Sequence, residues 1–66
     1  MNNLYDTIID QRAALADFHL KAASAEWDGR TDDAAWYDNL AADTLRSLTA
    51  NERWYHKTTG RTVPTA

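Results

Sequence analysis

Apolar residues recur every three or four positions over two long stretches of the chain, which one short polar segment separates. Residues 4–28 contain no proline or glycine and are rich in alanine, as is typical of a helix. The second stretch covers residues 32–58, and Gly60 and Pro64 follow it as stop signals. The pattern therefore predicts an all-α chain with helices over residues 3–28 and 32–58.

The polar segment between the two stretches carries helix stop and start signals within a few residues. Gly29 stands where a left-handed residue ends a helix, and Thr31 with two following aspartates supplies a cap and acids for the next helix. Two helices joined by so short a turn, residues 29–31, form an antiparallel hairpin over residues 1–59. A calcium loop is not expected there, because the segment lacks oxygen ligands at the alternate positions that such a loop requires.

One feature complicates the second helix. Residues 49–52 (TANE) fit a capping box, which would start a short third helix after a kink near Thr49. The apolar contact that accompanies such a box is missing, because Arg53 stands where a partner for Leu48 is required. A continuous helix is therefore favoured, with the kink near Thr49 as the alternative. Residues 60–66 are expected to form a frayed tail.

The apolar positions of the first helix form two adjacent seams when they are placed at about 100° per residue. One seam consists of Leu4, Ile8, Leu15, Phe18 and Ala22, and the other consists of Tyr5, Ile9, Ala16, Leu20, Ala23 and Trp27. Together they cover roughly 200° of the helix, whereas one packing neighbour needs a stripe of roughly 100°. A single facing helix cannot cover both seams, so we expect the hairpin to dimerise into a four-helix bundle.

The second helix is expected to turn a row of large residues toward the first. Its predicted inner face consists of Tyr37, Ala41, Leu45, Leu48 and Tyr55. With the bend centred near Arg30, Leu15 lies opposite Leu45, and Tyr5 lies opposite Tyr55. Small residues then oppose large ones, as interdigitated packing requires.

Two tryptophans of the second helix share one flank, because their separation of about eighteen residues makes about five full turns. They either fold over the edge of the hairpin, pack in a homodimer core, or dock another protein, since tryptophan is enriched among interface hot spots. The residues predicted to bind partners are Trp36, Leu40, Trp54, Tyr5 and Trp27.

Length and composition favour association. A chain of 66 residues buries only roughly 60% of its unfolded surface, and it has no cysteine for a disulfide or a thiolate ligand. Small proteins of this kind commonly gain stability by oligomerising or by docking on a partner. Neither a signal sequence nor a long apolar run occurs, so we expect a cytoplasmic protein that does not enter a membrane.

The net charge of −3 argues against direct binding of nucleic acid, because an acidic protein repels phosphate. Four acids fall on the back of the first helix: Asp6, Asp10, Asp17 and Asp28. This acidic face is either a solvated surface or one that imitates a nucleic-acid backbone and occupies a basic groove. Gln11, Arg12 and Glu26 interrupt the apolar arc, where they either fix register and partner choice or extend to its edge.

No catalytic, cofactor-binding or metal-binding residues are predicted. A zinc site needs three or four ligands, and neither His19 nor His56 stands three residues after an acid, as helical di-metal sites require. Ser24 and Ser47 have no histidine placed to activate them, and no glycine-rich phosphate loop occurs. We therefore expect a protein that is not an enzyme.

Two partial resemblances concern architecture alone. Residues 29–41 (GRTDDAAWYDNLA) resemble the turn and second-helix start of a tetratricopeptide repeat, with Gly29, Ala34 and Ala41 at the matching small positions; no second copy follows. The length and central bend resemble those of plasmid copy-number proteins, which dimerise as two hairpins but bind RNA through a basic face that is not found here. Both resemblances imply a helical hairpin.

The sequence thus predicts a small acidic helical regulator that forms a homodimer and acts by binding another, unidentified protein. The alternative is a phage or mobile-element inhibitor of a host nuclease, polymerase, CRISPR or restriction complex, which acts through the acidic face. A third possibility is a structural part of a larger assembly.

Overall fold

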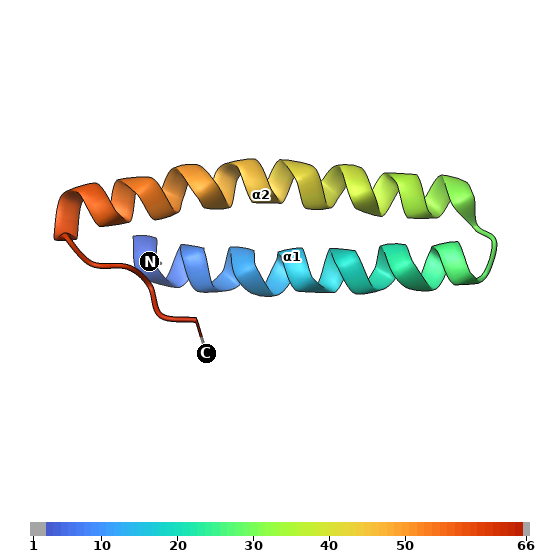
Figure 1. The fold of residues 1–66 in the computed structure, drawn as a ribbon, viewed down its shortest axis with the longest axis horizontal. Helices are drawn as coiled ribbons and strands as arrows, with labels where there is room; N and C mark the ends of the chain where they lie inside the picture. Colours follow the sequence, from blue (N-terminus) through green and yellow to red (C-terminus); the bar gives the residue numbers. More distant parts are fainter. Residues whose placement is uncertain (1–2, 66) are drawn as a thin grey trace.

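The computed structural model describes residues 3–65. It contains two antiparallel helices, α1 (Leu4–Trp27) and α2 (Thr31–Thr59), joined by a tight bend (Figure 1). The molecule is a rod of 44 by 21 by 19 Å. The predicted all-α hairpin is confirmed, and α2 continues through Thr49 without a break, so the described residues contain no third helix.

Local sequence signals set the ends of the helices. Asn3 caps α1, because its side-chain oxygen accepts a hydrogen bond of 2.8 Å from the backbone N–H of Asp6. Gly29 has φ +76°, a left-handed conformation that costs glycine little and other residues more. The expected cap of α2 is corrected: Thr31 is the first helical residue, and Arg30 occupies the cap position without a side-chain hydrogen bond.

The helices pack through one stripe each, in which residues recur at alternating spacings of four and three. On α1 this stripe is Leu4, Ile8, Gln11, Leu15, Phe18, Ala22 and Ala25, all buried or half-buried. On α2 it is Ala34, Tyr37, Ala41, Thr44, Leu48, Asn51 and Tyr55, again all buried or half-buried. The spacing is that of side chains that interlock between aligned helices. We call these two stripes together the inner seam.

The inner face of α2 differs at one position from the one expected from the sequence. Thr44 is half-buried within the inner seam, and one further residue turns a helical side chain through about 100°. Leu45 therefore lies at the edge of the seam and is 49% exposed, so its predicted place on the inner face was wrong. The expected contact of Tyr5 with Tyr55 is confirmed, edge to face with ring centroids 6.0 Å apart.

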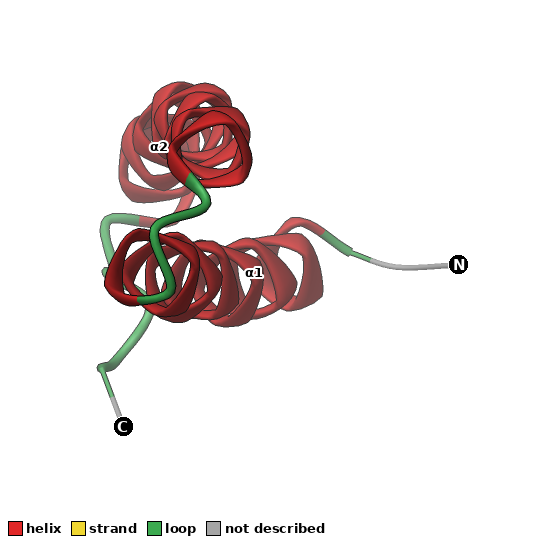
Figure 2. Ribbon diagram, turned by 90° about the vertical axis from the view of Figure 1, so that its right-hand side faces the viewer, coloured by secondary structure: helices red, strands yellow, loops and turns green. Residues whose placement is uncertain are grey.

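A small core closes the open end of the hairpin, opposite the bend. Ile8, Leu48 and Val63 are buried there, with Leu4, Leu15 and Tyr55 packed against them. Val63 belongs to the C-terminal segment, which leaves α2 at Gly60 and crosses α1 (Figures 1 and 2). The expectation of a frayed tail is therefore corrected for residues 61–65, because burial of an apolar side chain holds the segment against the helices.

Toward the bend the inner seam buries only small side chains. The buried residues there are Ala22, Ala25, Ala34 and Ala41. Alanine lets two helices approach closely but removes little apolar area from water. Three large apolar residues of this half are mainly exposed, namely Leu20, Trp27 and Trp36 at 72%, 91% and 60%, whereas Phe18 and Tyr37 are half-buried in the seam.

Candidate interaction surfaces

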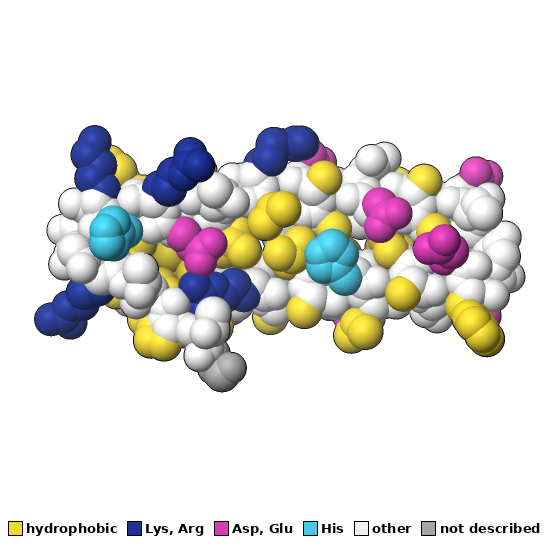
Figure 3. All heavy atoms as spheres, viewed as in Figure 1, with side chains coloured by type: hydrophobic (Ala, Val, Ile, Leu, Met, Phe, Trp, Pro, Cys, Tyr) yellow, Lys and Arg dark blue, Asp and Glu magenta, His cyan; other side chains and the backbone are white. Residues whose placement is uncertain are grey.

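The side of α1 that faces away from α2 carries an uncovered apolar stripe. Its residues are Ile9, Ala13, Ala16, Leu20, Ala23 and Trp27, all exposed, and we call it the outer stripe. Figure 3 shows hydrophobic side chains projecting along this lower edge of the molecule. At about 100° per residue the outer stripe lies about 150° around the helix from the inner seam, so α2 cannot cover it. It corresponds to the second seam expected from the sequence, with Ala13 added and Tyr5 left at its border.

Two of the predicted partner-binding residues belong to this side of α1. Trp27 ends the outer stripe at the bend and makes little contact with its own chain. Tyr5 borders the stripe at the other end, where it is 39% exposed and rests against Tyr55. The two aromatic residues are therefore separated by roughly 33 Å along the helix and do not contact each other within a single copy.

The other three predicted residues lie together on one flank of α2, which we call the tryptophan flank. Trp36 and Trp54 are 60% and 57% exposed, and Leu40 between them is half-buried. Because α2 is continuous, both indole rings project from the same side of the helix. Trp36 is held edge to face against Tyr37, with ring centroids 5.4 Å apart. Exposed tryptophans are enriched among the residues that carry binding energy at protein interfaces, so this flank is a candidate docking surface.

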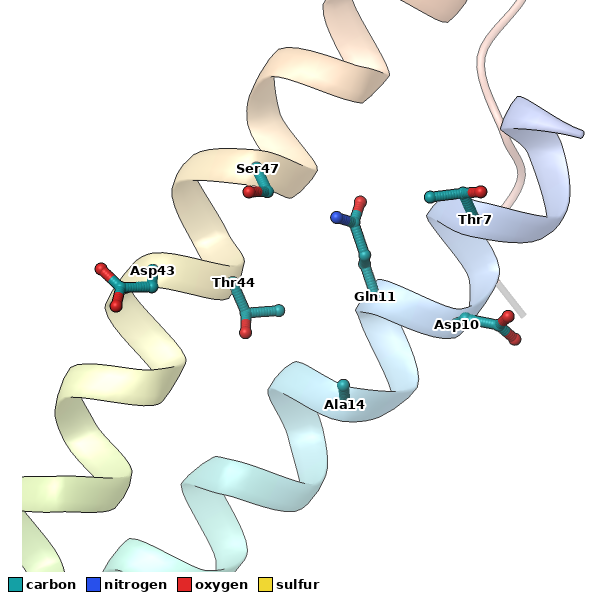
Figure 4. A pocket seen from close by; sticks show the side chains of 7 residues that line it. All are labelled: Thr7, Asp10, Gln11, Ala14, Asp43, Thr44 and Ser47. Carbon is teal, nitrogen blue, oxygen red and sulfur yellow. The ribbon is translucent and has the colours of Figure 1, made fainter. Parts of the chain in front are cut away.

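An open groove of about 460 Å³ runs between the helices, lined by Thr7, Asp10, Gln11, Ala14, Asp43, Thr44 and Ser47 (Figure 4). Gln11 and Thr44 reach into the space, whereas the carboxylates of Asp10 and Asp43 point away from it. Sites for small molecules are generally enclosed and mainly apolar, with few polar groups. This groove offers hydrogen-bonding groups without enclosure, so it is not a strong candidate for such a site.

Arg12 joins α1, α2 and the C-terminal segment at the open end. Its guanidinium donates hydrogen bonds of 2.7 Å to the Pro64 carbonyl, 2.8 Å to the Val63 carbonyl and 2.7 Å to the Glu52 carboxylate. Charged donors make stronger hydrogen bonds than neutral ones, and the Arg12 side chain is only 24% exposed. The sequence had left open whether Arg12 fixes register in an assembly; the structure shows partners within its own chain.

The other two residues that interrupt the apolar arc have different environments. The side-chain amide of Asn51 donates a hydrogen bond of 2.9 Å to the Gln11 side-chain oxygen. This pair satisfies two polar groups inside the inner seam, where unpaired groups are costly. Glu26, by contrast, is exposed near the bend. Sequence reasoning did not identify Asn51, Glu52 or Val63 as partners, because each lies about forty to fifty residues from the side chain it binds or covers.

The four residues of the acidic face are all exposed, namely Asp6, Asp10, Asp17 and Asp28. Two of them have cationic neighbours: Lys21 Nζ lies 2.9 Å from Asp17, and the Arg30 guanidinium lies 3.4 Å from Asp28. The hydrogen bond and charge of Asp17 raise the pKa of Lys21 above its ordinary value. The acidic face therefore presents less uncompensated charge than four free carboxylates would.

Within residues 3–65 no three His, Asp or Glu side chains gather closely enough to hold a metal ion. Neither α1 nor α2 combines the length and the apolar character that crossing a membrane requires. No family model matches the chain, and comparisons with curated proteins and with solved structures found no similar protein. Function is therefore inferred from the surfaces of the hairpin.

Proposed function

We propose that the chain is a small acidic interaction module or regulator that works in the cytoplasm as a homodimer and acts by binding another protein. The outer stripe of α1 is the observation that carries this proposal. It is a continuous apolar face along one helix, and it ends in a tryptophan that is 91% exposed. Burial of apolar surface contributes about 25 cal/mol per Å², so covering such a face favours association.

Self-association accounts for the outer stripe, and the tryptophan flank supplies a surface for a different protein. Trp36 and Trp54 present large apolar areas on the other helix, and Trp36 is oriented by its contact with Tyr37. Aromatic anchors of this kind carry a large share of binding energy at protein interfaces. The role is therefore one of binding and not of catalysis, and the acidic charge argues that the bound partner is not nucleic acid itself.

Photochemical cross-linking tests whether the tryptophan flank binds another protein. A photoreactive phenylalanine analogue replaces Trp36 or Trp54, and the matched control places it at Ala42, an exposed position on another side of α2. We expect both flank positions to capture the same protein in the native host, and excess unlabelled protein to compete. Capture of that protein from Ala42 as well, or of nothing from either flank position, contradicts the proposal.

The exposed acidic face supports a second candidate function, inhibition of a nucleic-acid-binding complex. A row of carboxylates on a helix occupies a basic groove by charge complementarity. Replacing Asp6, Asp10 and Asp17 together by asparagine distinguishes the candidates. If the host protein binds through the tryptophan flank, this triple variant binds it nearly as well as the original, whereas Trp36→Ala weakens binding. Loss of binding in the triple variant, with binding by Trp36→Ala retained, supports the inhibitor.

A further inference from the structure

Helix α1 carries two apolar stripes, on nearly opposite sides, with the same alternation of four and three residues. The inner seam is occupied by α2. The outer stripe runs from Ile9 to Trp27 at spacings of four, three, four, three and four, with no polar residue at any of its positions. A helix with this repeat packs lengthwise against another helix. The shape and spacing of the outer stripe therefore fit a second helix that packs along it.

The outer stripe is complementary to itself when a second copy runs in the opposite direction. An antiparallel arrangement centred near residue 18 pairs Leu20 with Ala16 and Ala13 with Ala23 of the second copy, and each pair occurs twice by symmetry. Leu20 then faces the small Ala16 on both sides of the centre, which avoids crowding there, while Ala13 and Ala23 form small layers that let the helices approach closely. A parallel arrangement would place Leu20 against Leu20 and Trp27 against Trp27, which crowds those layers.

The two ends of the stripe also match in the antiparallel arrangement. Trp27 of one copy falls on Ile9 of the other, next to Tyr5. Tyr5 is already fixed by its edge-to-face contact with Tyr55, so it offers Trp27 an ordered aromatic neighbour. The exposed aromatic residues that lie roughly 33 Å apart in one copy are thereby brought together twice in a pair.

The charges beside the stripe are compatible with this arrangement. On one border Glu26 of each copy falls near the Arg12 guanidinium of the other, which is already bound to Glu52 and to the C-terminal segment of its own chain, so this pair adds little attraction. On the other border the two Asp17 carboxylates approach each other at the centre, but each is already paired with its own Lys21 at 2.9 Å. Antiparallel helices also oppose their macrodipoles, whereas parallel helices align them.

We propose that two copies pair through their outer stripes as an antiparallel, two-fold α1–α1 contact centred near residue 18. This inference rests on the homodimer of the proposed function and specifies its interface. Because the outer stripe lies about 150° from the inner seam, the four helices form a row and not a closed square bundle. Both copies of α2 lie on the outside of the row, and the tryptophan flanks remain free for another protein.

Cysteine cross-linking tests the direction and register, because the natural chain has no cysteine. Ala13→Cys and Ala23→Cys are prepared separately, oxidised alone, and then oxidised as an equal mixture. A disulfide needs Cα atoms about 4.4–6.8 Å apart. In the antiparallel pair residue 13 faces residue 23, while identical positions lie roughly 15 Å apart along the helices. Ala50→Cys, at an exposed position on α2, is the control.

The expected result is a covalent heterodimer that forms only in the mixture of Ala13→Cys and Ala23→Cys, with the joined peptides confirmed by mass spectrometry. Efficient disulfides in each variant alone indicate a parallel pair and overturn the proposal. If the original protein is dimeric but no combination cross-links, the proposed antiparallel register is wrong, while the homodimer of the proposed function stands. If the original protein is monomeric at every concentration, the homodimer of the proposed function fails with it.

A charge placed on the stripe gives an independent test. Leu20→Glu changes a side chain that is 72% exposed, so the isolated hairpin keeps its helicity. The dimer is expected to dissociate at least tenfold more readily, because the carboxylate would be buried without a partner. Leu45→Glu on α2 is the matched control and leaves the dimer intact. Dissociation by the change at Leu45 but not at Leu20 places the interface elsewhere and overturns the proposal.

Discussion

The two ends of the hairpin are built from the same pair of helices but are held together differently. At the open end Ile8, Leu48 and Val63 are buried in a core of large side chains, and Arg12 ties both helices to the C-terminal segment. Toward the bend only alanines are fully buried, and Leu20, Trp27 and Trp36 are mainly exposed. The open end therefore supplies most of the buried core of one copy, and the bend half holds three of its most exposed large apolar side chains.

This difference is what the proposed function requires of a chain of 66 residues, which has to fold and also offer apolar surface to a partner. Small proteins bury little apolar surface, and every large side chain turned outward is lost to the core. Leu20, Trp27 and Trp36 are lost in the bend half, where close helix contact through alanine keeps the backbone in place, and Trp54 is lost at the open end. Changes at the open end should affect folding, and changes in the bend half should affect association.

The largest contrast is expected between two leucines. Leu48→Ala removes a buried side chain that is 4% exposed, and it should lower the free energy of unfolding by roughly 2–5 kcal/mol. Leu20→Ala, at 72% exposure, should change the stability of the single copy by less than about 0.5 kcal/mol. Urea denaturation at low protein concentration measures both. Similar losses for the two variants would contradict the division between the halves.

The next effect concerns the polar contacts of the open end. Arg12→Met keeps an apolar stem but removes three hydrogen bonds, and leaves the Glu52 carboxylate without its partner. We expect a loss of about 1.5–3 kcal/mol, as is usual for hydrogen bonds to charged groups. Arg46→Met, which breaks an exposed pair with Asp43, serves as the control and should have little effect. Faster amide exchange at Val63 in the Arg12 variant would show that the C-terminal segment is released.

Sequence signals near each other in the chain predicted the hairpin correctly. The left-handed Gly29 and the uninterrupted α2 depend on contacts within about one helical turn, which sequence patterns describe directly. The Tyr5–Tyr55 contact was also predicted, because antiparallel helices with a short bend have a nearly fixed register.

The errors arose where a small offset or a distant contact decided the outcome. Thr44 occupies the seam position that was expected for Leu45, and one residue turns a helical side chain through about 100°, so Leu45 lies at the edge of the seam. The tail was expected to fray because proline and glycine end the helix, but Val63 packs against Ile8 and Leu48 far away in sequence. The outer stripe was visible as a seam, while its separation of about 150° from the inner seam became clear only with the contacts of α2.

A smaller effect is expected at the bend itself. Gly29→Ala should cost about 1–2 kcal/mol, because a Cβ atom is strained at φ +76° even though no atom lies within 4 Å of its position. Gly29→Asn should cost less, since asparagine tolerates the left-handed region better than alanine. Thermal unfolding of the two variants compares them. An equal cost for both would indicate that the left-handed conformation does not limit the stability of the bend.

The smallest effect concerns the ion pair of Lys21 with Asp17. Because the folded state raises the pKa of Lys21, the pair contributes its stability fully below the unfolded pKa and loses it as pH rises through the folded pKa. Lys21→Gln should remove this alkaline loss and leave the behaviour near neutral pH nearly unchanged. Unfolding monitored by circular dichroism over an alkaline pH series measures this loss of stability. Identical alkaline profiles for the original protein and Lys21→Gln would show that the ion pair does not cause the loss.

Sedimentation equilibrium over a wide range of concentration tests the central claim most directly, namely that the apolar face of α1 requires a second molecule. The predicted result is a mass that rises from that of the 7.5 kDa chain to twice that value. For Leu20→Glu the mass should stay at one chain over the same range. A compact monomer at every concentration of the original protein, with the outer stripe still in solvent, would contradict the account.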